Sequence, residues 1–240
     1  MIPPVRRTIL SVSDEISPRL DTCKAPDTIG KVDFIISCGD LPFDHLEFLM
    51  TCFNTPMYYV LGNHDGDGFY RSNGEVDYQP DAGESIDGNA LEAKGILIAG
   101  LGGSIRYGQT VKNQYTEAEM WRRVLKLAPQ LLSNQARYGR RLDILVTHSP
   151  ARGIHESEDA AHRGFAAFRW LLEWAKPRWM LHGHTQFARP PHSLCTRVGS
   201  TDVMYVPPFK LLHWGDDNRS DPKPPPHDPP RDGDNGKRTR

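Results

Sequence analysis

Short runs of apolar residues recur along the chain and are separated by polar, glycine-rich or helix-like segments. The runs occupy residues 8–12, 33–37, 57–61, 95–99, 143–147 and 178–181. Most are apolar at every position rather than at alternate positions, which is typical of strands that are covered on both faces. The pattern therefore predicts a buried β-sheet core.

Three segments between these runs have helical patterns, at residues 45–52, 116–128 and 165–175. The second is the clearest, because Thr116 and Glu119 have the spacing of a capping box and an apolar stripe at helical spacing follows them. Pro129 is expected to end or kink this helix. Strands that alternate with helices indicate a layered α/β fold.

Two segments lack this patterning. Residues 66–88 are rich in Gly, Asp and Ser, which predicts a long surface loop. From residue 216 onward the chain is rich in proline and charge and has almost no apolar residue, which predicts a disordered tail. The chain of 240 residues is long enough for one well-buried core. We therefore expect one domain over residues 1–215 and a Pro-rich tail over residues 216–240.

Composition narrows the class of protein. The formal net charge is −1, which gives no general attraction to nucleic acid or to an anionic membrane, so neither is an expected partner. No apolar run approaches the roughly 20 residues of a membrane span. The 4 cysteines include no C-x-x-C pair, and we interpret them as reduced thiols of a cytoplasmic protein.

Side chains that can bind a metal ion follow five of the six apolar runs. They are Asp14, Asp40, Asn63 with His64, His148, and His184. Ligands in α/β folds gather at the carboxyl ends of strands, so these groups can meet although they are far apart in sequence. Carboxylate, amide and imidazole ligands suit Mn, Fe, Zn or Mg, whereas a soft thiolate site would use cysteine.

The order of these groups resembles the signature blocks of the calcineurin-like metallophosphoesterase family. The matching blocks are Gly39-Asp40, Gly62-Asn63-His64-Asp65, Thr147-His148 and Gly183-His184. Residues 100–104 and 115–120 also resemble a bacterial subgroup of that family. The resemblance covers roughly residues 8–212. It implies an α/β fold of four α-β-β-α layers, a sandwich of mixed sheets flanked by helices, with a two-metal centre.

The resemblance also implies roles for individual residues. The implied metal ligands are Asp14, Asp40, Asn63, His148, His184 and Gln186. Asp40 would bridge two divalent ions, His64 would be the catalytic acid, and Asp65 would orient His64. His162 and Arg163 lie on the segment after His148. We expect them to hold a substrate phosphate, because a guanidinium pairs with phosphate bidentately.

The chain departs from the family pattern at two positions. Ile16 stands where the first block usually has histidine, and Gln186 replaces the last histidine of the final block. Both missing imidazoles belong to the first metal ion. An amide oxygen is a weaker ligand than imidazole for borderline metals, so that ion is expected to be loose, harder (Mg or Mn), or absent. We therefore expect one or two divalent ions per chain.

The predicted function is a metal-dependent phosphoesterase, either a phosphatase or a phosphodiesterase. A metal-bound hydroxide would attack the phosphorus of a phosphorylated small molecule or nucleotide, and His64 would protonate the leaving oxygen. The alternative is a binding protein or scaffold that keeps the fold with weakened catalysis, as the two departures suggest. A nuclease is disfavoured, because nucleic-acid grooves are normally basic.

Overall fold

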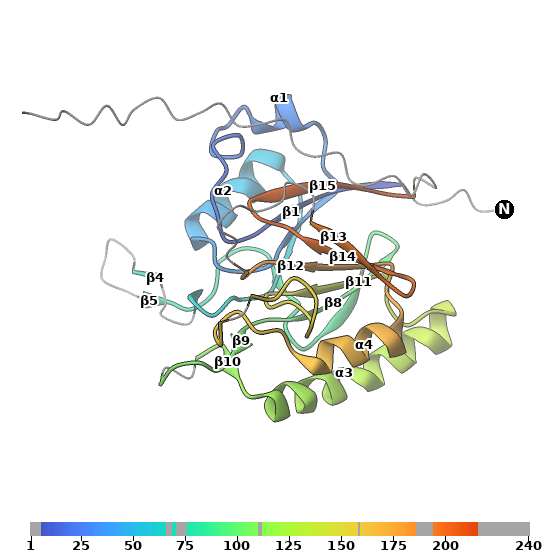
Figure 1. The fold of residues 1–240 in the computed structure, drawn as a ribbon. Coiled ribbons are helices and arrows are strands. Elements are labelled where there is room, and N and C mark those ends of the chain that lie inside the picture. Colours follow the sequence, from blue (N-terminus) through green and yellow to red (C-terminus); the bar gives the residue numbers. More distant parts are fainter. Residues whose placement is uncertain are drawn as a thin grey trace, which may run out of the picture.

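The computed structural model describes residues 6–65, 69–70, 76–109, 112–157, 159–185 and 194–215. The predicted tail, residues 216–240, lies outside the described residues. Two β-sheets face each other at the centre of the molecule, and helices cover their outer faces (Figure 1). No helix among the described residues is both long and apolar enough to cross a membrane.

The first sheet has the strand order β15-β1-β2-β3-β6. Its strands are β1 (Arg7–Val12), β2 (Phe34–Ser37), β3 (Met57–Tyr59), β6 (Glu84–Ser85) and β15 (Phe209–Trp214). Strands β1, β2, β3 and β6 are parallel to their neighbours, and β15 closes the edge by antiparallel pairing with β1. The parallel strands therefore all end on the same side of the sheet.

The second sheet has the order β13-β14-β12-β11-β8-β7. Its strands are β7 (Ala90–Ala93), β8 (Ile96–Leu101), β11 (Ile144–Thr147), β12 (Trp179–His182), β13 (Cys195–Val198) and β14 (Thr201–Tyr205). The four central strands are parallel and the two edge strands are antiparallel. Two small ribbons are formed by β4 (Phe69–Tyr70) with β5 (Val76–Asp77), and by β9 (Ser104–Ile105) with β10 (Gln114–Tyr115).

Three apolar clusters fill the three spaces between four layers. Helices α1 (Ala25–Ile29) and α2 (Phe43–Phe53) pack on the first sheet through a cluster that includes Leu10 and Leu46. Helices α3 (Glu117–Tyr138) and α4 (Ala166–Ala175) pack on the second sheet through a cluster that includes Phe168. The cluster between the sheets includes Ile36 and Val146. The α/β fold of four α-β-β-α layers is therefore confirmed (Figure 1).

Each predicted strand corresponds to an observed strand, with shifts of a few residues at the ends. The edge strands β7, β13 and β15, the inner strand β14, and the short helix α1 had no sequence prediction. The expected loop at residues 66–88 contains β4, β5 and β6 in its described part, so it is not wholly irregular. Short strands in a polar segment carry almost no hydrophobic period, which explains why they were missed.

Pro129 does not end the predicted helix, because α3 continues to Tyr138. The capping box of Thr116 and Glu119 is present as predicted. The buried stripe of α3 also continues past the proline to Leu131, and Pro129 itself lies on the exposed side. Water can therefore reach the carbonyl of Leu125, four residues earlier, which loses its helical partner.

We expect Pro129→Ala to raise the free energy of unfolding by about 2 kcal/mol. A proline inside a helix destabilises the folded state by about 3 kcal/mol. Proline also stiffens the unfolded chain, and this effect offsets about 1 kcal/mol of that loss. Urea denaturation measures the difference. The control is Ser133→Ala on an exposed position of the same helix, which should change stability by about 0.5 kcal/mol or less. Equal stability of Pro129→Ala and the wild type would contradict this account.

Candidate metal centre

Five predicted ligands lie directly after parallel strands of the two sheets. Asp14, Asp40 and Asn63 follow β1, β2 and β3, whereas His148 and His184 follow β11 and β12. Ligand atoms of Asp40, His148 and His184 all lie within 4.8 Å of one another. The two sheets thus bring together Asp40 and His184, which are 144 residues apart in the sequence.

The acceptor atoms around His148 converge on one point. The Nδ1–H of His148 donates to the carbonyl oxygen of Cys38 at 2.8 Å, which leaves Nε2 with its lone pair. Nε2 lies 3.0 Å from Oδ1 of Asn63 and 3.1 Å from Oδ2 of Asp40. Three acceptors that face one another repel unless a positive charge sits among them. The residues present therefore fit a bound cation.

The same conclusion follows from the protonation of His148. Burial would lower the pKa of His148, but the charge and hydrogen bond of Asp40, together with Asp14 and the Cys38 carbonyl, raise that pKa to about 9. Burial likewise would raise the pKa of Asp40, but His148 and His64 together lower it to about 2. In the absence of an ion, a second proton on His148 supplies the positive charge. A metal ion would replace that proton, because a ligating imidazole is neutral.

His184 is prepared as a neutral ligand. Its Nε2–H donates to the carbonyl oxygen of Ala161 at 2.8 Å, which leaves Nδ1 with the free lone pair. Burial, together with nearby His148, lowers the pKa of His184 to about 3. The rings of His148 and His184 lie 4.8 Å apart between centroids. A neutral imidazole with one nitrogen anchored and the other free is the form that binds a metal ion.

The backbone at the centre is unusual. Asp14, Asp40 and His184 have φ angles of 61°, 57° and 66°, in the left-handed region that residues with side chains rarely adopt. Such conformations cost of order 1–3 kcal/mol each and persist where surrounding structure enforces them. Their concentration at three ligand positions supports a functional role for this turn geometry.

Two glycines make room for the side chains. A Cβ atom on Gly62 would lie 2.0 Å from Oδ1 of Asp40 and 2.7 Å from Cε1 of His148. A Cβ atom on Gly183 would lie 2.0 Å from Oδ2 of Asp14. Glycine is therefore required at both positions by the close approach of the ligand side chains to the backbone.

Asp14 stands beside this cluster rather than within it. Its carboxylate accepts hydrogen bonds from the hydroxyl of Ser13 at 2.5 Å and from the backbone N–H of His184 at 2.9 Å. Burial raises the pKa of Asp14 above its ordinary value. Ile16 is 39% exposed, and Gln186 lies outside the described residues. Of the residues that the resemblance implies for a first metal ion, the described part of the chain thus contains Asp14 and Asp40.

His64 and Asp65 contribute differently from each other. His64 is exposed, and its backbone N–H donates to Oδ1 of Asp40 at 3.0 Å. Oδ2 of Asp65 accepts from the backbone N–H groups of Gly62 at 2.7 Å and Asp40 at 3.0 Å. Burial raises the pKa of Asp65 to about 6. Asp65 therefore ties the loops after β2 and β3 together through Oδ2, and its role in orienting the His64 ring stays a prediction.

The two predicted phosphate-binding residues lie at different depths. The ring centroid of His162 is 4.9 Å from that of His184, so His162 borders the cluster. Nδ1 of His162 contacts both carboxylate oxygens of Asp159 at 2.8 Å. Arg163 is exposed on the adjoining surface. His162 and Arg163 thus lie on the segment that leads to the centre.

Sequence patterns missed two further features. The amide nitrogen of Asn63 donates to the hydroxyl of Tyr107 at 3.0 Å, and no motif singles out this tyrosine. His182 forms a second imidazole pair with His155, with 2.8 Å between Nε2 and Nδ1. The position of His182 next to Gly183 is the one sequence feature that could have drawn attention to this pair.

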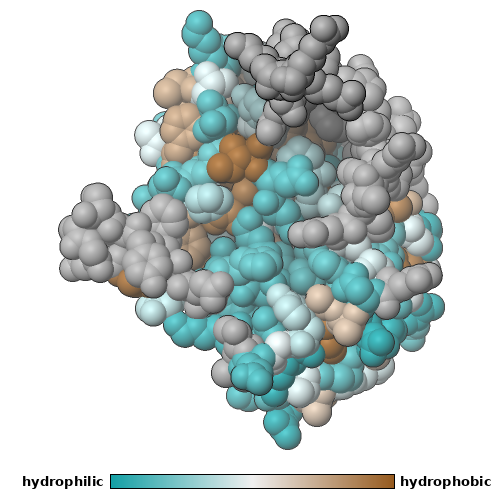
Figure 2. All heavy atoms as spheres, turned by 60° about the vertical axis from the view of Figure 1, so that its left-hand side comes forward, coloured by the Kyte–Doolittle hydropathy of each residue, from teal (hydrophilic) through white to brown (hydrophobic). Residues whose placement is uncertain are grey.

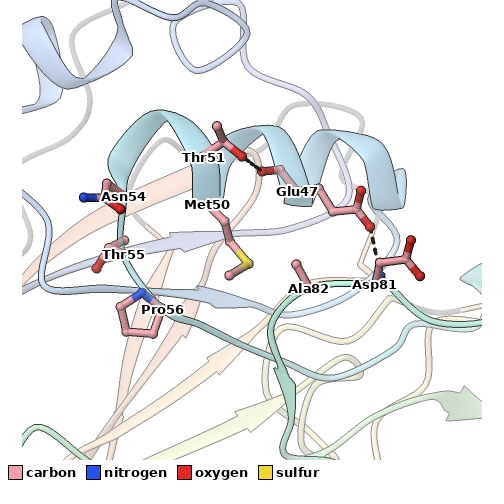
Figure 3. Close-up of a pocket in the computed structure, with 8 residues that line it drawn as sticks. All are labelled: Glu47, Met50, Thr51, Asn54, Thr55, Pro56, Asp81 and Ala82. Atoms are coloured by element: carbon pink, nitrogen blue, oxygen red, sulfur yellow. Dashed lines mark hydrogen bonds between the residues drawn. The ribbon is translucent and has the colours of Figure 1, made fainter.

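A hollow elsewhere on the surface lacks this chemistry. It lies along α2 and is lined by Glu47, Met50 and Asp81 among others (Figure 3). Glu47 accepts there from the backbone N–H of Asp81 at 2.9 Å. None of the predicted site residues lines it. The coloured surface seen in Figure 2 is largely hydrophilic, with small separate apolar patches.

Comparisons with known proteins give one family match. The profile of the family described as calcineurin-like phosphoesterase matches residues 11–186, a range that includes every predicted metal ligand. No curated protein sequence matches the chain significantly.

Several solved structures are similar in fold. Vacuolar protein sorting 29 from Cryptosporidium parvum is 11% identical with a TM-score of 0.41, over 88% of this chain and 86% of that chain. GAP50, the anchor in the inner membrane complex of Plasmodium, is 14% identical with a TM-score of 0.47, over 88% and 78%. Vps29 from Entamoeba histolytica, complexed with Zn²⁺, is 9% identical with a TM-score of 0.36, over 82% and 72%. The family assignment rests on the sequence profile, since every TM-score is below 0.5.

We expect Gly62→Ala to abolish stable metal binding, because the added methyl group would displace the Asp40 carboxylate. Metal content of the purified protein, measured by elemental analysis, tests this expectation. The control is Gly199→Ala, which also adds a methyl group at a positive φ of 58° but meets no atom within 4 Å. It should lose some stability and keep its metal. Normal metal content in Gly62→Ala would show that the ion binds elsewhere.

Proposed function

The chain belongs to the calcineurin-like phosphoesterase family, and we propose that it hydrolyses a phosphomonoester or phosphodiester with the help of a divalent metal ion. The observation that carries the proposal is the meeting of Asp40, Asn63 and His148 acceptor atoms at 3.0–3.1 Å. A phosphorylated small molecule or a nucleotide is the proposed substrate.

Four side chains would hold the ion: Asp40, Asn63, His148 and His184. A divalent ion bound there would polarise a phosphoryl oxygen and acidify a water molecule. The mixture of carboxylate, amide and imidazole suits Mn, Fe, Zn or Mg, and manganese is the proposed first choice for assays. None of the four cysteines, all of which lie in the described part of the chain, forms a disulfide, which supports the further proposal of a cytoplasmic location.

His64 is the proposed general acid. Its backbone is fixed by Asp40, while its exposed ring makes no hydrogen bond to a described residue. The ring is thus available to give a proton to the leaving oxygen of a bound ester. His162 and Arg163 are the proposed contacts for the substrate phosphate, at the rim next to His184.

The two metal sites are proposed to differ in strength. The site with His148 and His184 keeps all its expected side chains. The first site has no imidazole ligand among the described residues, and Asp14 already accepts from Ser13 and from the backbone of His184. We therefore propose that one ion binds tightly and that any second ion binds weakly.

A binding protein without catalysis is the alternative, motivated by Ile16 and Gln186. The exposed ring of His64 favours catalysis over that alternative. An exposed histidine beside a metal cluster contributes little to folding, whereas a hydrolase needs a proton donor there.

We expect His64→Ala to lower turnover of bis-aryl phosphodiester or aryl phosphate by about 10²–10⁴ while the metal content stays unchanged. Asp40→Ala should lose both metal and activity. The control is His213→Ala, an exposed histidine on β15, which should keep both. Assays use the full chain with added Mn²⁺. Loss of metal in His64→Ala would make it a ligand, and a wild type without activity would favour the binding protein.

Calorimetric titration of the chelator-treated protein with Mn²⁺ tests the proposed inequality of the sites. We expect one tight binding event per chain, followed at most by a much weaker one. Two ions of equal affinity would contradict this reading and would require Gln186 or another group to replace the missing imidazoles.

A further inference from the structure

The orientation of the Asn63 amide is a condition for metal binding. Its oxygen must face Nε2 of His148, because an amide N–H₂ turned toward a cation would repel it. Oxygen and nitrogen of an amide have nearly the same shape, so packing alone selects the orientation weakly. A hydrogen-bond partner that accepts from Nδ2 is needed to make the choice.

Tyr107 supplies this partner. The amide nitrogen of Asn63 donates to the phenol oxygen of Tyr107 at 3.0 Å, while Oδ1 lies 3.0 Å from His148. Asn63 is 5% exposed, so water is a poor substitute for the phenol. Outer partners of this type are known to hold metal ligands in position.

The segment that carries Tyr107 is fastened to the same loop as Asn63. Nδ2 of Asn113 donates to the carbonyl oxygen of Gly62 at 3.0 Å, and the backbone N–H of Gly103 donates to that of Leu61 at 2.7 Å. On the other side, Arg106 pairs with Glu119 of the α3 capping box at 2.9 Å. The position of Tyr107 relative to Asn63 is therefore defined by contacts on both sides.

Among the described residues, the proton of this phenol has no acceptor and so remains available as a donor. A phenol hydroxyl that accepts from Asn63 still has its own proton to donate. Tyr107 is 45% exposed, so a molecule bound over the metal centre can reach that proton. A phosphate group offers acceptor oxygens and no obligatory donor, which matches a donor in this place.

We propose that Tyr107 is a positioning residue that fixes the Asn63 amide for metal binding and donates a hydrogen bond to a phosphoryl oxygen of the substrate. The first half stands on the metal centre alone. The second half rests on the proposed phosphoesterase function.

Mn²⁺ titration of Tyr107→Phe tests the first half. We expect Mn²⁺ affinity to fall about tenfold, the usual loss when an outer partner of a ligand is removed. The matched control is Tyr138→Phe at the end of α3, also partly exposed at 38%, which should stay within about twofold of the wild type. The exposed ring makes misfolding of Tyr107→Phe an unexpected outcome, and thermal unfolding checks this. Unchanged Mn²⁺ affinity in the folded variant overturns the positioning role.

Inorganic phosphate tests the second half. At saturating Mn²⁺, Tyr107→Phe should bind phosphate several-fold more weakly than the wild type and Tyr138→Phe do. Equal phosphate affinity would overturn the donor role. A wild type that hydrolyses no phosphoester would refute the proposed function, whereas the Mn²⁺ titration would still decide the positioning role.

Discussion

The centre depends on the mutual repulsion of acceptor atoms that the fold holds together. Oδ2 of Asp40 and Oδ1 of Asn63 each lie about one hydrogen-bond length from Nε2 of the buried His148. Isolated acceptors in such a place cost several kcal/mol. The arrangement is stable only if a proton or a metal ion joins them, and the anchored Nδ1 of His148 leaves one position for that charge. The fold therefore favours a bound cation at this position, and the remaining ligands determine which cation binds.

Two sheets are needed to impose this crowding. Asp40 and Asn63 follow strands of one sheet, and His148 and His184 follow strands of the other. The apolar cluster between the sheets fixes their separation, so the ligands cannot move apart to relieve the repulsion. The ligand side chains also lie so close to the backbone at Gly62 and Gly183 that neither position has room for a Cβ atom. Asp65 adds a clamp, since its carboxylate joins the backbone after β2 to that after β3.

The central strands and the meeting of Asp40, His148 and His184 were predictable because they depend on local order: a continuous apolar run followed by a side chain that can bind a metal ion. The course of α3 beyond Pro129 was not, because it depends on which face of the helix is buried and not on proline itself. The contacts of Asp65 and Tyr107 were also beyond sequence reasoning. They join side chains to backbone or amide groups across 25 and 44 residues, and such pairings leave no spacing pattern.

The proposed difference between the two metal sites follows from which ligands each site keeps. The site with His148 and His184 keeps one carboxylate and two imidazoles that would hold a divalent ion, and both rings have hydrogen-bonded outer partners. The site at Asp14 has carboxylate ligands but no described imidazole. The carboxylate of Asp14 also accepts a hydrogen bond from the backbone N–H of His184. That hydrogen bond fixes the turn which carries His184. Asp14 thus holds His184 in place as a ligand of the other site. Asp14 therefore has a structural role even if the first ion binds weakly.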